Sequence, residues 1–118
     1  MTIGLKRAYE PPAKDDGRRV LVDRVWPRGI SRDDLRIDAW LKDLAPSTGL
    51  RKWFGHDPSK WDEFKERCAR ELEQHAEAIE QLLETARAGR VTLVFGAKDV
   101  LHNNAVALKE HLERRLQR

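Results

Sequence analysis

Two short polar stretches carry side chains suited to ligand binding and proton transfer. In the string VLVDRVWPRGI, residues 20–30, a carboxylate, two guanidinium groups and an indole follow a run of apolar residues. In the string AKDVLHN, residues 97–103, an ammonium, a carboxylate, an imidazole and an amide follow another apolar run. Guanidinium groups bind phosphate or carboxylate in a bidentate manner, and an imidazole titrates near neutral pH. These residue types indicate a pocket for an anionic ligand.

Each of these side chains has a candidate role. As catalytic candidates, Asp23 would act as a general base or clamp a hydroxyl group, His102 would donate a proton, and Lys98 would add positive charge at a helix start. The candidate ligand-binding residues are Arg7, Arg24, Trp26, Arg28, Arg51, Asp99 and Asn103. Arg28 is the strongest of them, because it lies between a proline and a glycine that shape the backbone and let the side chain reach outward.

A purely structural role is the alternative for each residue. Asp23 could pair with Arg24 or Arg28, and Arg28 could form a salt bridge with acids on a helix. Asp99 or Asn103 could cap the last helix, since both residue types accept hydrogen bonds from the first free N–H groups of a helix. Capping would leave the neighbouring lysine and histidine free, so both roles can hold together.

Several established kinds of site are not indicated. The single cysteine excludes an intrachain disulfide, and Cys68 lies on an apolar helix stripe, which is typical of an inert buried thiol. The four histidines stand at no spacing typical of metal ligands. The sequence contains neither a glycine-rich nucleotide loop nor the Gly-x-Ser-x-Gly motif of esterases. We therefore expect no metal and no cofactor.

Length and composition predict one soluble domain over residues 1–118. The chain has 118 residues, of which 40% are hydrophobic and 36% charged. Its longest apolar runs are too short to cross a bilayer, so no membrane partner is expected. The N-terminus lacks the charged start and apolar stretch of a secretory signal, and with one cysteine a reducing, cytoplasmic location is expected.

The charge distribution leaves room for a second kind of partner. The net charge is +3, yet residues 61–84 carry eight acids against three bases, so the remainder of the chain holds a net +8. The basic excess falls around the strands and loops, where it could meet an anionic partner. Nucleic acid is therefore an alternative partner, with Trp26 stacked against a base. Solvated surface charge explains the same distribution equally well.

The elements that would position these residues follow from the apolar pattern. Strands are predicted at residues 3–6, 19–25 and 91–95, and helices after Ser31, at residues 47–54, from Asp57 to Gly89, and through Leu101, Ala105, Leu108, Leu112 and Leu116. The stretch from Asp57 to Gly89 fits one long helix or two with a break near residues 74–75, and residues 40–44 fit either a helical or an extended piece.

These elements predict an α/β fold: a single small domain with a short, mainly parallel sheet of about three to four strands, flanked by helices. Ligands of such sheets bind beyond the carboxyl ends of the strands. The candidate residues follow the predicted strands directly, so they should gather at one edge of the sheet. Arg51, Lys52 and Trp53, from the short helix at residues 47–54, could join them there.

Three long strings resemble the YeaO-like branch of the domain-of-unknown-function 488 family. They are DGRRVLVDRVWPRGIS, WLKDLAPSTGLRKWFGHDPSKWDEF and VTLVFGAKDVLHNNAVALKEHL, which together cover most of the chain. The resemblance implies a small bacterial α/β protein and no particular reaction. It also implies that the motif includes Asp23, Arg24, Trp26, Pro27, Arg28, Pro46, Ser47, Arg51, Trp53, Lys98, Asp99, His102 and Asn103.

The chain departs from the wider family at one chemically important place. Relatives often carry a cysteine at the end of the last strand and a Cys-His-Arg sequence beyond it, whereas this chain has Phe95 and Gly96 there, followed by Leu101, His102 and Asn103. Thiol chemistry is therefore not expected. The expected function is binding of, or action on, a small phosphate-like or nucleotide-like anion. Nucleic-acid binding is the first alternative, and a non-catalytic interaction or regulatory module is the second.

Overall fold

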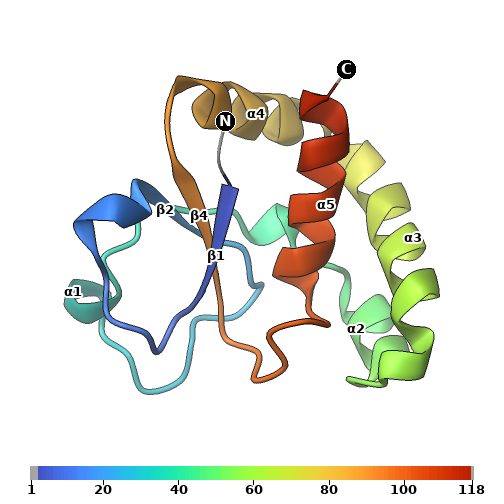
Figure 1. The fold of residues 1–118 in the computed structure, drawn as a ribbon. Coiled ribbons are helices and arrows are strands. Elements are labelled where there is room, and N and C mark those ends of the chain that lie inside the picture. Colours follow the sequence, from blue (N-terminus) through green and yellow to red (C-terminus); the bar gives the residue numbers. More distant parts are fainter. Residues whose placement is uncertain (1–2, 118) are drawn as a thin grey trace.

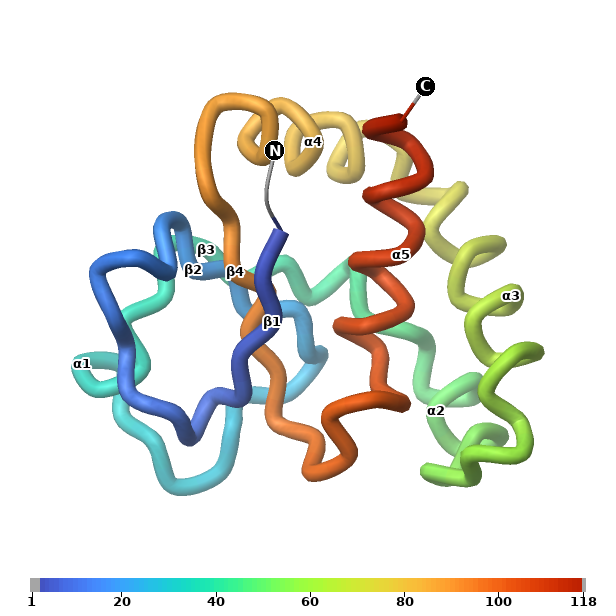
Figure 2. Tube along the Cα trace, in the orientation of Figure 1, coloured from blue at the N-terminus to red at the C-terminus, as the bar shows by residue number. Residues whose placement is uncertain are grey.

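A four-stranded parallel sheet lies at the centre of the molecule (Figures 1 and 2). The computed structural model describes residues 3–117. The strands are β1 (Ile3–Arg7), β2 (Arg18–Leu21), β3 (Ala39–Trp40) and β4 (Val91–Phe95), in the order β1-β4-β2-β3. Every pairing between them is parallel, so their carboxyl ends share one edge. The predicted α/β class with a short parallel sheet is confirmed.

Five α-helices and several 3₁₀ turns connect and cover these strands within residues 3–117. The helices are α1 (Arg32–Leu35), α2 (Thr48–Phe54), α3 (Trp61–Leu72), α4 (Ala76–Ala88) and α5 (Asn104–Leu116). A 3₁₀ turn at Glu73–His75 separates α3 from α4, so the stretch before Gly89 forms two helices rather than one. The segment at residues 39–44 is first extended, as β3, and then a 3₁₀ turn. No helix in this part of the chain is long and apolar enough to cross a bilayer.

Side-chain caps fix where the helices begin. The hydroxyls of Ser31 and Ser47 and the amide of Asn103 each accept a backbone N–H from the first turn of α1, α2 and α5, respectively. The prediction that Leu101 belongs to the last helix is wrong, because α5 starts three residues later and the Leu101 residue is 68% exposed. Asp99 explains this, since its carboxylate accepts the N–H of Leu101 and closes a separate turn before the helix.

Both faces of the sheet are covered, as three consecutive apolar residues in the second predicted strand indicate. On one face, Val20 and Leu93 pack with residues of α4 and α5 in the larger apolar cluster. On the other face, Leu21 and Val94 pack with Leu35 of α1 and with two indole rings, those of Trp26 in the loop before α1 and Trp40 in β3. Because both faces of the sheet are packed against other side chains, a ligand can reach the sheet only at its edges.

The second strand is shorter than predicted, and this shapes the site. β2 ends at Leu21 rather than at residue 25, although the N–H of Val22 still donates to the carbonyl of Val94 at 3.1 Å. Beyond Val22 the chain turns away from the sheet, because β4 itself ends at Phe95 and offers no further partner. Asp23 and Arg24 thus leave the sheet at its carboxyl edge.

A buried ion network joins the strands on the face that carries α1. The carboxylate of Asp16 accepts hydrogen bonds from Lys6 Nζ at 3.0 Å, Arg19 Nη1 at 2.7 Å and the backbone N–H of Ala13 at 2.9 Å. Arg19, which is 4% exposed, also donates to the carbonyl of Leu35. The charges compensate each other, as buried ions require. The network supports the fold and takes no part in the site.

Candidate functional site

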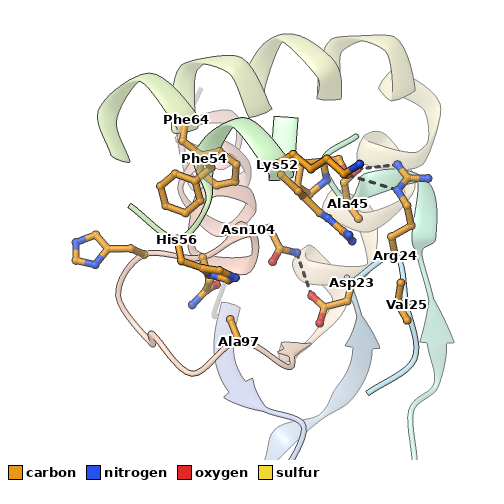
Figure 3. Close-up of a pocket in the computed structure, with 14 residues that line it drawn as sticks. Asp23, Arg24, Val25, Ala45, Lys52, Phe54, His56, Phe64, Ala97 and Asn104 are labelled. Atoms are coloured by element: carbon orange, nitrogen blue, oxygen red, sulfur yellow. Dashed lines mark hydrogen bonds between the residues drawn. The ribbon is translucent and has the colours of Figure 1, made fainter. Parts of the chain in front are cut away.

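A pocket of about 340 Å³ opens at the carboxyl edge of the sheet, where ligands of parallel sheets bind. It lies between the segment after β2, the N-terminal end of α5 and helix α2 (Figure 3). The residues that line it are Asp23, Arg24, Val25, Ala45, Pro46, Arg51, Lys52, Phe54, His56, Phe64, Ala97, His102, Asn103 and Asn104. Five predicted site residues therefore meet here: Asp23, Arg24, Arg51, His102 and Asn103.

The carboxylate of Asp23 lies on the side of the pocket formed by the segments that follow β2 and β4, which we call the strand-end wall. Its Oδ2 accepts the backbone N–H of Gly96 at 2.8 Å, and its Oδ1 accepts the amide of Asn104 at 3.1 Å. Burial raises the pKa of Asp23 above its usual value, although these two hydrogen bonds and the positive charge of Arg51 act in the opposite direction. The side chain forms no ion pair with Arg24 or Arg28, contrary to the structural alternative, and remains available to a ligand.

Two asparagines at the start of α5 have different tasks. Asn103 caps the helix through its side-chain oxygen, 3.0 Å from the N–H of Val106, and its side-chain nitrogen donates to the carbonyl of Asp99. The side-chain nitrogen of Asn104, Nδ2, donates two hydrogen bonds of 3.1 Å, one to the carbonyl of Val22 and one to the carboxylate of Asp23. These two bonds set the orientation of the Asn104 amide, so its oxygen points away from Asp23 in Figure 3.

The positive charges of the pocket come from two elements. Arg24 lies beside Ala45 and Pro46 and donates to their carbonyls at 3.2 and 3.4 Å, which ties the loop before α2 to the end of β2 (Figure 3). Arg51 and Lys52, on α2, are exposed and make no hydrogen bond or ion pair through their side chains with residues 3–117. Arg24 thus positions the wall, whereas the two α2 side chains are free to meet an anion.

Aromatic side chains close the pocket on the side of α2 and α3. The rings of Phe54 and Phe64 stack at 4.0 Å between centroids with an interplanar angle of 13°, and both line the cavity. This apolar wall excludes water from one side of the pocket, so charges nearby interact more strongly than they would in bulk water.

His102 lies at the pocket edge and is held by two neighbours. Its Nδ1 is 3.0 Å from Asp99 Oδ2, and its ring meets the Trp61 ring edge-on at 5.3 Å. The N–H of Leu101 contributes most to lowering the pKa of Asp99, burial acts to raise this pKa, and His102 lowers it further. Asp99 therefore orients His102 and leaves Nε2 as the ring nitrogen open to a ligand.

Five of the predicted site residues do not line this pocket: Asp99, which orients His102, and Arg7, Trp26, Arg28 and Lys98. Arg7 donates to the carbonyl of Ala97 at 2.8 Å and so supports the loop after β4 from outside. The Trp26 Nε1–H donates to the carbonyl of Ile30 at 2.7 Å, and its ring packs on the α1 side of the sheet, as a core residue does.

Arg28 and Lys98, the other two, are exposed. The backbone carbonyl of Arg28 accepts a hydrogen bond from the hydroxyl of Tyr9 at 3.1 Å, and its side chain makes no hydrogen bond or ion pair with residues 3–117. Neither the Arg28 guanidinium nor the Lys98 ammonium lines the pocket near Asp23. The positive charges on the side opposite Asp23 come from α2 instead.

The sequence interpretation missed several residues that line the pocket. Asn104 follows a predicted site residue directly at the start of a helix, and that position was an available signal. Lys52 was expected at this edge together with Arg51 and Trp53, and of these three residues Arg51 and Lys52 line the pocket whereas Trp53 does not. Phe54 and Phe64 showed only the apolar spacing of core residues, and their place in the wall follows from how α2 packs on α3.

The one cysteine of the chain lies outside the pocket. Cys68 is buried in the α2–α3 cluster, and burial raises its pKa to about 12, so the thiol is an inert packing group as the sequence indicates. Within residues 3–117, no group of three His, Cys, Asp or Glu side chains is arranged to hold a metal ion.

Comparison with known proteins adds a family relationship. A family model described as the inactive DUF488-N3 subclade matches residues 2–118. The chain is 41% identical over 112 residues to the uncharacterized protein YeaO of Escherichia coli (strain K12), covering 95% of this chain and 97% of that protein. It is 42% identical over 113 residues to the uncharacterized proteins Mb3100c of Mycobacterium bovis and Rv3073c of Mycobacterium tuberculosis, covering 96% of this chain and 95% of each relative. No solved structure matches the chain significantly.

Proposed function

This chain belongs to the DUF488 family, and the subclade whose model it matches is described as inactive. We therefore propose that the protein binds a small anionic ligand and does not catalyse its conversion. The observation that carries the proposal is the pocket at the carboxyl edge of the sheet, where the Arg51 and Lys52 side chains of α2 make no hydrogen bond or ion pair with residues 3–117. A guanidinium beside an apolar wall is a strong donor to phosphate or carboxylate.

Binding fits the lining residues better than catalysis. None of the residues that line the pocket carries a hydroxyl or thiol group that could act as a nucleophile. Asp23 and His102, proposed from sequence for proton transfer, are held by Asn104 and Asp99 in positions that suit hydrogen bonding to a bound molecule. Lys98 is exposed and outside the lining, so it does not contact the ligand in this proposal.

The test is isothermal titration of inorganic phosphate, propyl phosphate and a ten-nucleotide single-stranded DNA into the wild type, Arg51→Gln and Arg70→Gln. Arg70 is an exposed arginine on α3, outside the pocket, and serves as the matched charge control. One charge-assisted hydrogen bond contributes about 1.5–3 kcal/mol. We therefore expect Arg51→Gln to weaken phosphate binding about ten-fold or more, and Arg70→Gln to leave it unchanged.

Thermal unfolding provides an independent measurement. A ligand at one hundred times its Kd adds about 2.7 kcal/mol to the free energy of unfolding. For a domain of this size that is a rise in Tm of roughly 10 °C. Binding of the oligonucleotide alone, with an affinity that falls steeply with salt, would instead favour the nucleic-acid alternative. Absence of binding by all three probes would refute the proposal.

A further inference from the structure

The strand-end wall of the pocket holds a carboxylate that lacks a positive partner. Asp23 is half-buried, and its oxygens accept only from the neutral groups of Gly96 and Asn104. No Lys, Arg or His side chain of residues 3–117 lies within ion-pair distance of it. A partly buried charge without a counter-ion costs stability, so a cationic group entering the pocket would be favoured at this point.

A second acceptor lies in the same wall, on the side of the Asn104 amide that points away from Asp23. Because the Asn104 nitrogen is committed to the carbonyl of Val22 and to Asp23, its amide oxygen is left with no donor among residues 3–117. The orientation cannot reverse without placing two acceptors against the amide oxygen. This wall of the pocket therefore presents hydrogen-bond acceptors, and it selects a ligand group that only donates.

The α2 side of the pocket carries the opposite charge. Arg51 and Lys52 line the pocket there and make no side-chain hydrogen bond or ion pair with residues 3–117, and the positive charge of Arg51 acts to lower the pKa of Asp23. Figure 3 shows Lys52 and Asp23 on different sides of the pocket, with Asn104 between the aromatic rings and Asp23. The strand-end wall offers hydrogen-bond acceptors, and the α2 side offers positive charge. The pocket is therefore complementary to a molecule that carries one cationic and one anionic group.

We propose that the pocket binds a small zwitterion, whose ammonium group lies against Asp23 and Asn104 and whose phosphate or carboxylate group faces Arg51. This assignment rests on the proposed function and names the class of its ligand. An ammonium group has three N–H donors and no acceptor, so it satisfies both oxygens and supplies the missing counter-charge at once. A hydroxyl at the same place would supply one donor and no charge.

Three probes that differ at one atom test the proposal. They are 2-aminoethyl phosphate, 2-hydroxyethyl phosphate and propyl phosphate, titrated calorimetrically into the wild-type protein at pH 7.5. Of the three probes, 2-aminoethyl phosphate alone carries an ammonium group that can form a charge-assisted hydrogen bond with Asp23. We therefore expect its Kd to be lower than those of the other two by about ten-fold or more. Asp23→Asn should abolish this preference, whereas Asp33→Asn, at an exposed aspartate of α1, should keep it.

The outcomes separate this inference from the proposed function. Equal affinities for the three probes in the wild type would overturn the zwitterion assignment and leave anion binding intact. Tighter binding of 2-hydroxyethyl phosphate than of the ammonium compound would also overturn it. Binding of none of them would overturn both proposals. The wild-type comparison stands by itself if Asp23→Asn fails to fold, and circular dichroism of that variant establishes whether it folds.

Discussion

Replacing Asp16 by asparagine should destabilise the protein far more than the same replacement at its exposed neighbour Asp15. The Asp16 side chain is 9% exposed and accepts from Lys6 and Arg19, whose side chains are 18% and 4% exposed. Asparagine keeps the size of the side chain and removes the negative charge. The substitution therefore leaves the buried Arg19 guanidinium without its negatively charged partner and with neutral acceptors alone, among them the carbonyl of Leu35.

The expected loss follows from this geometry. Removing one partner of a buried ion pair costs about 3–5 kcal/mol. A domain of 118 residues is stable by roughly 6–18 kcal/mol in total, so the variant should fold but unfold much earlier. The corresponding fall in Tm is about 10–20 °C.

Urea unfolding followed by circular dichroism at pH 7 measures this loss. Asp15→Asn is the matched control, because Asp15 is the exposed neighbour in the same 3₁₀ turn and should change the free energy of unfolding by less than about 0.5 kcal/mol. Equal unfolding midpoints for the two variants would refute the argument that the network is effectively buried.

The pH dependence gives a second check with a definite sign. Burial of Asp16 acts to raise its pKa, but the hydrogen bonds from Ala13, Lys6 and Arg19 outweigh it and hold the pKa below the usual range. A carboxyl group with a lowered pKa in the folded state stabilises above its unfolded pKa and loses that contribution as the pH falls through the folded value. The difference between wild type and Asp16→Asn should therefore shrink below about pH 4.

Three further predictions concern the pocket and the helices. Gly96→Ala should weaken binding of 2-aminoethyl phosphate several-fold in calorimetry, because the added Cβ would lie 3.3 Å from Asp23 Oδ2 and displace the carboxylate; an unchanged Kd would contradict this. Cys68 should resist iodoacetamide at pH 8 in the folded protein and react after unfolding, as mass spectrometry will show, since burial raises its pKa to about 12. Burial and neighbouring arginines lower the pKa of His111, so the wild type should lose stability as the pH falls below 6.5. His111→Gln should lose less between pH 7.5 and pH 5 in urea unfolding, and a parallel loss would contradict the assignment.

Local signals in the sequence were sufficient to place most elements. The strand at residues 91–95 agrees with β4 residue for residue. Ser31 and Ser47 cap helices as their positions predict, and Gly55 ends α2 with φ of 53°, a conformation that costs glycine little. These features depend on residues close together in the chain, and so they can be read without a structure.

Which of the candidate residues share one pocket is a different kind of property. Arg28 was the strongest candidate from its setting between proline and glycine, yet the turn after β2 leaves it exposed and outside the pocket. Asn104 drew no attention in the sequence, yet it joins Asp23 to the carbonyl of Val22. A residue separation of 81 positions carries no local signal of that contact.

The sequence by itself determined the α/β class, the parallel arrangement and the edge of the sheet where polar side chains collect, because apolar periodicity and turn residues act over a few positions. The tertiary structure alone decided which cations face Asp23 and which support the fold. That choice depends on where β2 ends, on how α2 packs against α3, and on the direction in which α5 leaves its cap. Each of these is set by long-range packing, in which segments far apart in the chain bury their surfaces together.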